Sequence, residues 1–354
     1  MTTVKVSTTD EMLALLPHQV GHRISRSLTV TVVSGGLLGP VARIDLPPER
    51  DVRPTARLLL EGLLRVAPEA ALVVGHESVP GESRSLLQAV HRGLRSAGVG
   101  IIDHVVVRDG RWWGWCCRPA DELDGLLLEH IEGHPVPDDF EVPAVAELIV
   151  RGSAPLGSRD EVGALVAEDP ARSASVGGVL ERLAEGDAGC EVERRPELWA
   201  RVLDPEEDRR DGCAASDEEL AHMVRSLVDK AWRDALVAWM SPVMFPLDKV
   251  DDVSTELLRR HVRTGAVTTS EHSEMVLRRL LAMTTRVPDT WPAEAAALCT
   301  VAGCVAWGVG NGSTAGDAVE RALRVHPGYT LAGYLVRMVE HQLRPRHRWG
   351  EVAA

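Results

Sequence analysis

The sequence predicts an α/β domain at the N-terminus, with a mixed sheet and the element order α-β-β-α-β-α-β-β, followed by an all-α domain. Two observations support this fold class. In residues 1–115, short β-branched or wholly apolar runs alternate with segments of helical periodicity. From Ser216 onward, helical periodicity alone remains. Strands that alternate with helices imply right-handed crossovers, and therefore a sheet that is partly parallel.

The α/β domain is predicted to begin with one helix and two strands. A Thr-x-x-Glu capping box at residues 8–11 begins a short helix that is expected to end near Pro17. Residues 27–33 are rich in β-branched side chains and alternate, which is typical of a strand. Residues 37–46 follow a Gly-Gly turn and are predicted to form the return strand.

The remainder of this domain alternates helix and strand. Helices are predicted at 53–66 and 82–97, and strands at 70–75, 100–107 and 111–115. The first of these strands is wholly apolar, as expected for a strand covered on both faces. Asp109-Gly110 separates the last two strands, and glycine tolerates the positive φ of a primed turn, so a β-hairpin is expected there.

A connecting region is expected between the two domains. We predict an α/β domain at 1–150, a helical connector and polar linker at 151–215, and an α-helical domain at 216–354. Residues 185–215 combine charge with glycine and proline and have few apolar anchors. We therefore expect that stretch to lack a packed core.

The end of the chain has the spacing of a helical repeat. Small residues and a proline match one tetratricopeptide unit, in which two antiparallel helices approach closely: Gly303, Gly310, Ala315, Ala322 and Pro327. This spacing predicts a tetratricopeptide-like helical hairpin at the end of the all-α domain. An ordinary helical hairpin is the alternative.

Composition limits the classes of function. The 354-residue chain has a formal net charge of −13, which argues against general nucleic-acid binding, because phosphate contacts depend on clustered Lys and Arg. No apolar run approaches the ~18 residues of a membrane span. No signal-peptide pattern is visible, so a cytoplasmic location is expected. The six cysteines are scattered through a large chain, which argues against a disulfide framework.

Several loose motifs follow one another along the whole chain. They are Leu15-Leu16-Pro17, Gly21, Ser27-Leu28-Thr29-Val30, Arg43-Ile44-Asp45-Leu46-Pro47, residues 107–112, 151–161 and 228–234, Ala306-Trp307-Gly308, Glu320-Arg321-Ala322-Leu323 and residues 327–332. In this order they resemble the actinobacterial family catalogued as domain of unknown function 4192. The resemblance implies no established activity. After the first cysteine, such proteins usually carry Cys-Cys-Pro and then Gly-x-Pro, whereas this chain retains Gly133-His134-Pro135 in a longer acidic insert.

One spacing is typical of a metal site. Cys117, His130 and His134 follow the pattern C-x12-H-x3-H, which resembles the second half of a zinc finger. The adjacent Cys116 would face the other side of a strand, so a fourth ligand would have to be His104 or a carboxylate. Apart from zinc at this position, no cofactor is expected. The alternative is a half-buried thiol beside solvated histidines.

Three aspartates near strand ends are the candidate catalytic residues. Asp45, Asp103 and Asp109 are placed as acidic clusters are in metal-dependent phosphoryl-transfer folds, although aspartate is also a common turn former. The loop at 75–81 follows a buried strand and precedes a helix, where anions bind in α/β folds; a plain connecting loop is the alternative. The sequence contains no P-loop, dinucleotide fingerprint or nucleophile elbow.

Aromatic and basic residues are the candidates for partner binding. Trp112, Trp113 and Trp115 lie on the predicted hairpin, where neighbouring rings face opposite sides, so at least one is expected at the surface or a domain contact. Core packing is the alternative. A basic groove is expected on the helical domain, formed by Arg259, Arg260, Arg263, Arg278 and Arg279 together with Arg344, Arg346 and Arg348. Pairing of these arginines with local carboxylates such as Glu256 is the alternative.

Three functions remain open at this level. The first is a non-catalytic binding or adaptor protein with a protein partner, because catalytic signatures are missing while exposed aromatics and a helical tail are expected. The second is a metal-dependent hydrolase or nuclease-like enzyme that uses the three aspartates. The third is a zinc-stabilised regulator. Neither a nucleic acid nor a membrane is expected as a partner.

Overall fold

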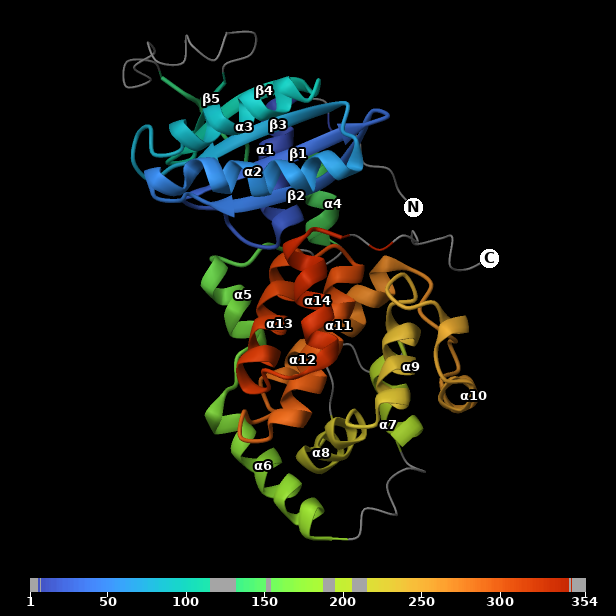
Figure 1. Cartoon of the computed structure of the whole chain (residues 1–354). Helices are drawn as coiled ribbons and strands as arrows, with labels where there is room; N and C mark the ends of the chain where they lie inside the picture. The colour runs from blue at the N-terminus through green and yellow to red at the C-terminus, as the bar shows by residue number, and fades with distance from the viewer. Residues whose placement is uncertain are drawn as a thin grey trace. The chain divides into compact units, whose positions relative to one another are not determined.

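The chain divides into two compact units, Met1–Arg159 and Asp160–Ala354, the first containing a sheet and the second helical. A computed structural model describes residues 6, 8–114, 132–150, 154–186, 195–205, 215–343 and 345 (Figure 1). The predicted combination of a mixed sheet with helices and a helical C-terminal region is confirmed. No helix among the described residues is long and apolar enough to cross a membrane.

The sheet of the first unit has six strands in the spatial order β2-β1-β3-β4-β5-β6. Their bounds are β1 Ser27–Ser34, β2 Leu37–Asp45, β3 Ala70–His76, β4 Gly100–Arg108, β5 Arg111–Gly114 and β6 His134–Pro135. Strands β3 and β4 are parallel, and the other described pairs are antiparallel. The parallel pair follows from the helical crossover between β3 and β4, since two strands joined in this way run in the same direction.

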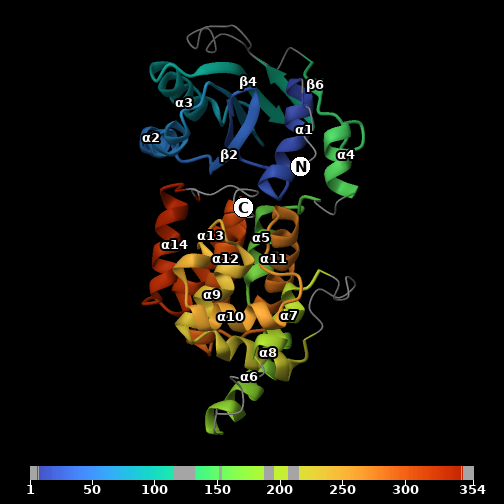
Figure 2. The same cartoon turned by 90° about the vertical axis from the view of Figure 1, so that its right-hand side faces the viewer.

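Helices cover both faces of this sheet. Helices α2 (Val52–Leu63) and α3 (Arg84–Ser96) lie on one face, and α1 (Thr9–Val20) and α4 (Pro143–Val150) lie on the other (Figure 2). Alternate residues of each central strand pack toward opposite faces, so Val73 joins the α2–α3 core while Leu72 joins the α1 core. This double cover explains why residues 71–76 of β3 are all buried.

Helix α1 corrects one expectation. The predicted capping box is present, since Thr8 accepts a hydrogen bond from the Glu11 N–H and Glu11 accepts one from the Thr8 N–H. The helix does not end near Pro17 but continues to Val20. Gly21, with φ 88°, ends the helix in the left-handed conformation, and its N–H donates to the Pro17 carbonyl.

The predicted β-hairpin at Asp109-Gly110 is confirmed. Strands β4 and β5 are antiparallel, with Arg108 opposite Arg111. The two turn residues have φ values of 52° and 72°, as a type I′ turn requires at both central positions. The local sequence therefore determined both the turn and the register of the strands that it joins.

The second unit is a helical assembly around one central helix. Its helices are α5 Arg159–Val166, α6 Pro170–Glu185, α7 Arg195–Leu203, α8 Asp217–Ser226, α9 Lys230–Met240, α10 Asp252–His261, α11 Ser270–Thr284, α12 Pro292–Gly308, α13 Gly312–Val325 and α14 Thr330–Glu340. Every residue of α12 from Glu294 to Trp307 is buried, because neighbouring helices cover it on all sides.

Helix α7 corrects the expectation that residues 185–215 lack a packed core. The Trp199 side chain is fully buried, and its Nε1–H donates to the Ser226 hydroxyl over 3.0 Å. Leu198 and Val202 join the same core. The segment is polar on average, but it contains three apolar residues at helical spacing. These three residues are enough to anchor one helix. Residues 187–194 and 206–214 of the segment lie outside the described part of the chain.

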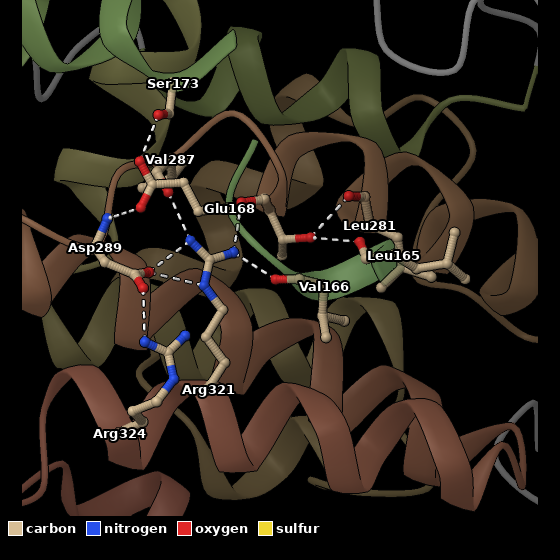
Figure 3. A network of polar contacts seen from close by, with 10 residues as sticks. Leu165, Val166, Glu168, Ser173, Leu281, Val287, Asp289, Arg321 and Arg324 are labelled. Atoms are coloured by element: carbon tan, nitrogen blue, oxygen red, sulfur yellow. Dashed lines mark hydrogen bonds and ion pairs between the residues drawn. The ribbon is translucent and has the colours of Figure 1, made fainter. Parts of the chain in front are cut away.

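A buried arginine connects several segments of this unit (Figure 3). Arg321 of α13 is 3% exposed, and its guanidinium donates to the backbone carbonyls of Val166, Thr284 and Val287. It also donates to the Asp289 carboxylate over 2.9 Å. One side chain thereby satisfies the Val166 carbonyl at the end of α5 and adds a donor to the Thr284 carbonyl at the end of α11, which also accepts from the Val287 N–H.

Candidate functional site

The three candidate catalytic aspartates do not form a cluster. Asp45 ends β2, and strands β1 and β3 separate it from β4, so three strand spacings of ~4.8 Å place it roughly 14 Å from that strand. Asp103 lies early in β4, whereas Asp109 lies in the turn beyond its far end. Asp45 instead forms an ion pair with Arg43. Within the described ranges, no group of three or more His, Cys, Asp or Glu residues is placed to hold a metal ion.

The loop after β3 contains its own anion. The buried Glu77 carboxylate accepts hydrogen bonds from the N–H groups of Gly81 and Ser83 and from the Ser83 hydroxyl, over 3.0, 3.1 and 2.6 Å. Arg108 of β4 forms an ion pair with the same carboxylate. These amides at the start of α3 are the groups that an external anion would need. Glu77 therefore serves as the internal ligand of this helix end.

Replacing Glu77 by Gln is expected to destabilise the α/β unit by about 2 kcal/mol, because the amide keeps the shape but loses the charge and turns one acceptor into a donor. Urea denaturation measures the change. Glu69→Gln, at an exposed position, is the matched control and is expected to change stability by less than about 0.5 kcal/mol. Equal effects of the two substitutions would contradict the structural role of Glu77.

Buried histidines in the α/β unit are paired with protein groups. His76 Nε2 is 3.1 Å from the Thr29 hydroxyl, and burial, with a smaller effect of Arg43, lowers the pKa of His76 to about 3. His91 of α3 and His104 of β4 are hydrogen-bonded to each other. Burial and the nearby His91 lower the pKa of His104 to about 4. These imidazoles are neutral at pH 7, and their positions under the covering helices favour a structural role over proton transfer to a substrate.

The hairpin tryptophans pack on opposite faces of the sheet. Trp112 packs on the α1 side, and its ring lies 4.9 Å from the His134 ring. Trp113 lies on the other side, beneath the Arg108 guanidinium at 5.0 Å from the ring centroid. The arrangement matches the expectation that neighbouring rings face opposite ways. Trp115, Cys117 and His130, and with them the proposed zinc spacing, lie outside the described residues.

The arginines expected to form a basic groove on the helical unit differ in their partners and in their exposure. Arg259 and Arg260 both form ion pairs with Glu256. Arg279 is buried and donates to backbone carbonyls at the end of α7. Arg263 and Arg278 are exposed. Pairing with a local carboxylate, the alternative interpretation, therefore holds for two of these five residues, Arg259 and Arg260. Arg344, Arg346 and Arg348 lie outside the described residues.

A different arginine-lined groove lies on the α/β unit between α2 and α3. Its volume is about 670 Å³, and its walls come from both helices and the residue that follows α2: Arg53, Ala56, Arg57, Leu60, Glu61, Leu64, Ala89 and Arg92. Gly93 of α3 shapes its floor, because a Cβ atom at that position would overlap the Leu60 side chain. The floor is thus apolar, and the exposed rims carry three cations and one carboxylate.

The three arginines of this groove are exposed and permanently charged. Within the described part of the chain, Arg53, Arg57 and Arg92 form no ion pair, whereas buried or half-buried arginines such as Arg108 do. A concentration of unpaired positive charge is unexpected on a chain whose net charge is −13. The sequence signal was the pair Arg53 and Arg57, which lie one turn apart on an exposed helical face. The approach of Arg92 from the next helix required the tertiary structure.

The comparison with protein families adds an identification. The family described as domain of unknown function DUF4192 matches residues 10–244 and 242–346. The chain belongs to the DUF4192 family. No curated protein and no solved structure matches it significantly.

Motifs that carry the DUF4192 resemblance contribute to the fold. Arg43 donates to the Ser27 hydroxyl over 3.1 Å and to Asp45, which joins two of these motifs across β1 and β2. Arg321, in a third motif, is the buried arginine of the helical unit. The groove arginines lie outside all the motifs. The family motifs therefore stabilise the fold, and none of them contributes an arginine to the groove.

Proposed function

We propose that this DUF4192 protein is a non-catalytic binding protein and that the groove between α2 and α3 is its contact surface for a protein partner. The observation that carries the proposal is a set of three arginines, Arg53, Arg57 and Arg92, that surround an apolar floor and form no ion pair with the described residues. Arginine and apolar surface together are the composition that protein interfaces favour, because the guanidinium supplies directional hydrogen bonds and the floor supplies apolar burial.

The chemistry of the lining supports binding over catalysis. Arg53, Arg57 and Arg92 hold a permanent positive charge and cannot act as bases. Glu61 is the sole carboxylate among the lining residues, which include no hydroxyl, thiol or imidazole. The nearby imidazole pair, His91 and His104, is buried beneath α3. The exposed lining thus offers three cations that could bind an anion and a single carboxylate, while the imidazole pair is buried.

Reversing two charges in the groove tests this proposal. In the double variant R53E/R57E, capture of the physiological partner by the purified full-length protein is expected to fall by at least about tenfold, because attraction becomes repulsion at the interface. The matched control is R263E/R278E, which makes the same charge change at exposed positions of the helical unit. Circular dichroism verifies that both variants are folded. If only the control variant lost capture, the binding surface would lie on the helical unit and the proposal would be wrong.

We also propose that the hairpin of α12 and α13 with α14 is tetratricopeptide-like and gives the protein an adaptor architecture. Its small residues support this proposal. A Cβ atom on Gly303 of α12 would lie 2.9 Å from the Leu335 Cδ2 of α14 and 3.5 Å from the Ala318 Cβ of α13. The glycine therefore permits the close approach of three consecutive helices, which is the property that this repeat requires.

A further inference from the structure

We infer that the occupant of the α2–α3 groove is an acidic amphipathic α-helix of a partner protein. This inference rests on the proposed function and adds the chemical class of the partner. Three properties of the groove carry it: the secondary structure of its walls, the spacing of its arginines, and the change of charge along α2.

The walls of the groove favour a helical occupant. Both are α-helices, whose main-chain groups are bonded within each helix, so the floor formed by Ala56, Leu60 and Ala89 offers no main-chain partner. An extended peptide on this floor would leave its own N–H and C=O groups unpaired at the apolar contact. A helix satisfies these groups internally and presents an apolar stripe, which is the recurring way in which a groove of this kind binds a partner.

The arginine spacing favours carboxylates on that helix. Arg53 and Arg57 are four residues apart on α2, which is about 6 Å along the axis. Two acidic residues four positions apart on a partner helix have the same separation. Arg92 projects from α3, on the other side of the groove, and is available to a third carboxylate. Arginine suits this role because its planar guanidinium binds a carboxylate in two parallel hydrogen bonds.

The charge changes sign along α2, and this disfavours a nucleic acid. Glu61 follows Arg57 by one further turn in the same groove and forms no ion pair among the described residues. A phosphate backbone has uniform negative charge and would be repelled at Glu61 as well as by the net charge of −13. A protein helix can carry carboxylates opposite the arginines and a basic residue opposite Glu61. The pattern of the groove is therefore complementary to a mixed-charge, mainly acidic helix.

Designed peptides test the inference on the full-length protein. Fluorescein-labelled amphipathic helices of about 16 residues, long enough to span the groove, share one leucine face and carry either Glu or Lys on the polar face. By fluorescence anisotropy, the Glu peptide is expected to bind at least about tenfold more tightly than the Lys peptide, and less tightly as salt is raised. The R53E/R57E variant is expected to reverse this preference, and R263E/R278E to retain it.

Two further probes separate the inference from its alternatives. A Glu peptide with a central proline keeps the charge but breaks the helix, and its affinity is expected to fall by at least about tenfold. Equal binding of the Glu and Lys peptides, or of the proline peptide, overturns the inference. Tight binding of a short oligouridylate that R53E/R57E abolishes would assign the groove to polyanions and overturn it too. If the Glu peptide fails but R53E/R57E still loses the physiological partner, the inference fails while the proposed function stands.

Discussion

Replacing Arg321 by Ala is expected to destabilise the helical unit by about 4 kcal/mol. The side chain is 3% exposed and donates to the carbonyls of Val166, Thr284 and Val287 and to Asp289. Its removal takes the guanidinium donor from three carbonyls and one carboxylate, in a space that water must then enter. The Thr284 carbonyl keeps the Val287 N–H, and Asp289 keeps Arg324. For a unit of this size, the midpoint of thermal unfolding should fall by roughly 10 °C.

Arg324 provides the matched control for this experiment. It donates to the other oxygen of the same Asp289 carboxylate over 2.9 Å, but its side chain is 60% exposed. Exposed ion pairs contribute little, so Arg324→Ala is expected to cost less than about 1 kcal/mol. Differential scanning calorimetry of both variants makes the comparison. A similar loss in the two proteins would show that the carboxylate contact, and not the carbonyl contacts of Arg321, supports the unit.

Acidification from pH 7 to pH 5 is expected to destabilise the α/β unit by about 4 kcal/mol. His76 and His104 have pKa values of about 3 and about 4 in the folded chain, against 6.5 for a free imidazole. The unfolded chain therefore binds protons that the folded chain does not, and stability falls as the pH falls. Since each pKa unit corresponds to about 1.4 kcal/mol, each histidine accounts for about 2 kcal/mol at pH 5. The lowered pKa values of His22 and His91 act in the same direction.

Hydrogen exchange measured by mass spectrometry reports the loss of stability at pH 5 separately for the α/β unit and the helical unit. After correction for the intrinsic rate, protection in β3 and β4 should decrease at pH 5. His76→Gln is the diagnostic variant, because glutamine can still bond to Thr29 but does not titrate in this range. Its loss of stability between pH 7 and pH 5 should be smaller by about 2 kcal/mol. An unchanged pH dependence in this variant would mean that His76 is protonated equally in both states.

Local signals in the sequence predicted the elements that depend on neighbouring residues. The turn at Asp109-Gly110 needs a positive φ at both positions, and the backbone preference of these two residues supplies it. The capping box at Thr8 is likewise complete within four residues. Average composition does not reveal helix α7, because spacing determines a buried face. Trp199 and two apolar neighbours at helical spacing indicate such a face.

The candidate site was predictable in part. Arg53 and Arg57 are visible in the sequence as an exposed pair on one helical face, but an exposed pair on an amphipathic helix is ordinary. Their significance comes from Arg92, which α3 brings to the same groove, and from the absence of an ion pair to any of the three in the described part of the chain. The same limit applies to Arg259 and Arg279, which are indistinguishable in the sequence although one pairs with Glu256 and the other is buried.

The sequence by itself determined the mixed sheet, the helical C-terminal region, the hairpin and the DUF4192 family, because each depends on short-range patterns or on the order of motifs along the chain. Only the tertiary structure decided which charged residues are available. Packing brings hydrogen-bond partners to Glu77 and Arg321. Among the described residues, it brings no ion-pair partner to the arginines of the α2–α3 groove. The physical reason is that a charge is satisfied by whatever lies within a few ångströms of it in space, and separation along the chain does not report that distance.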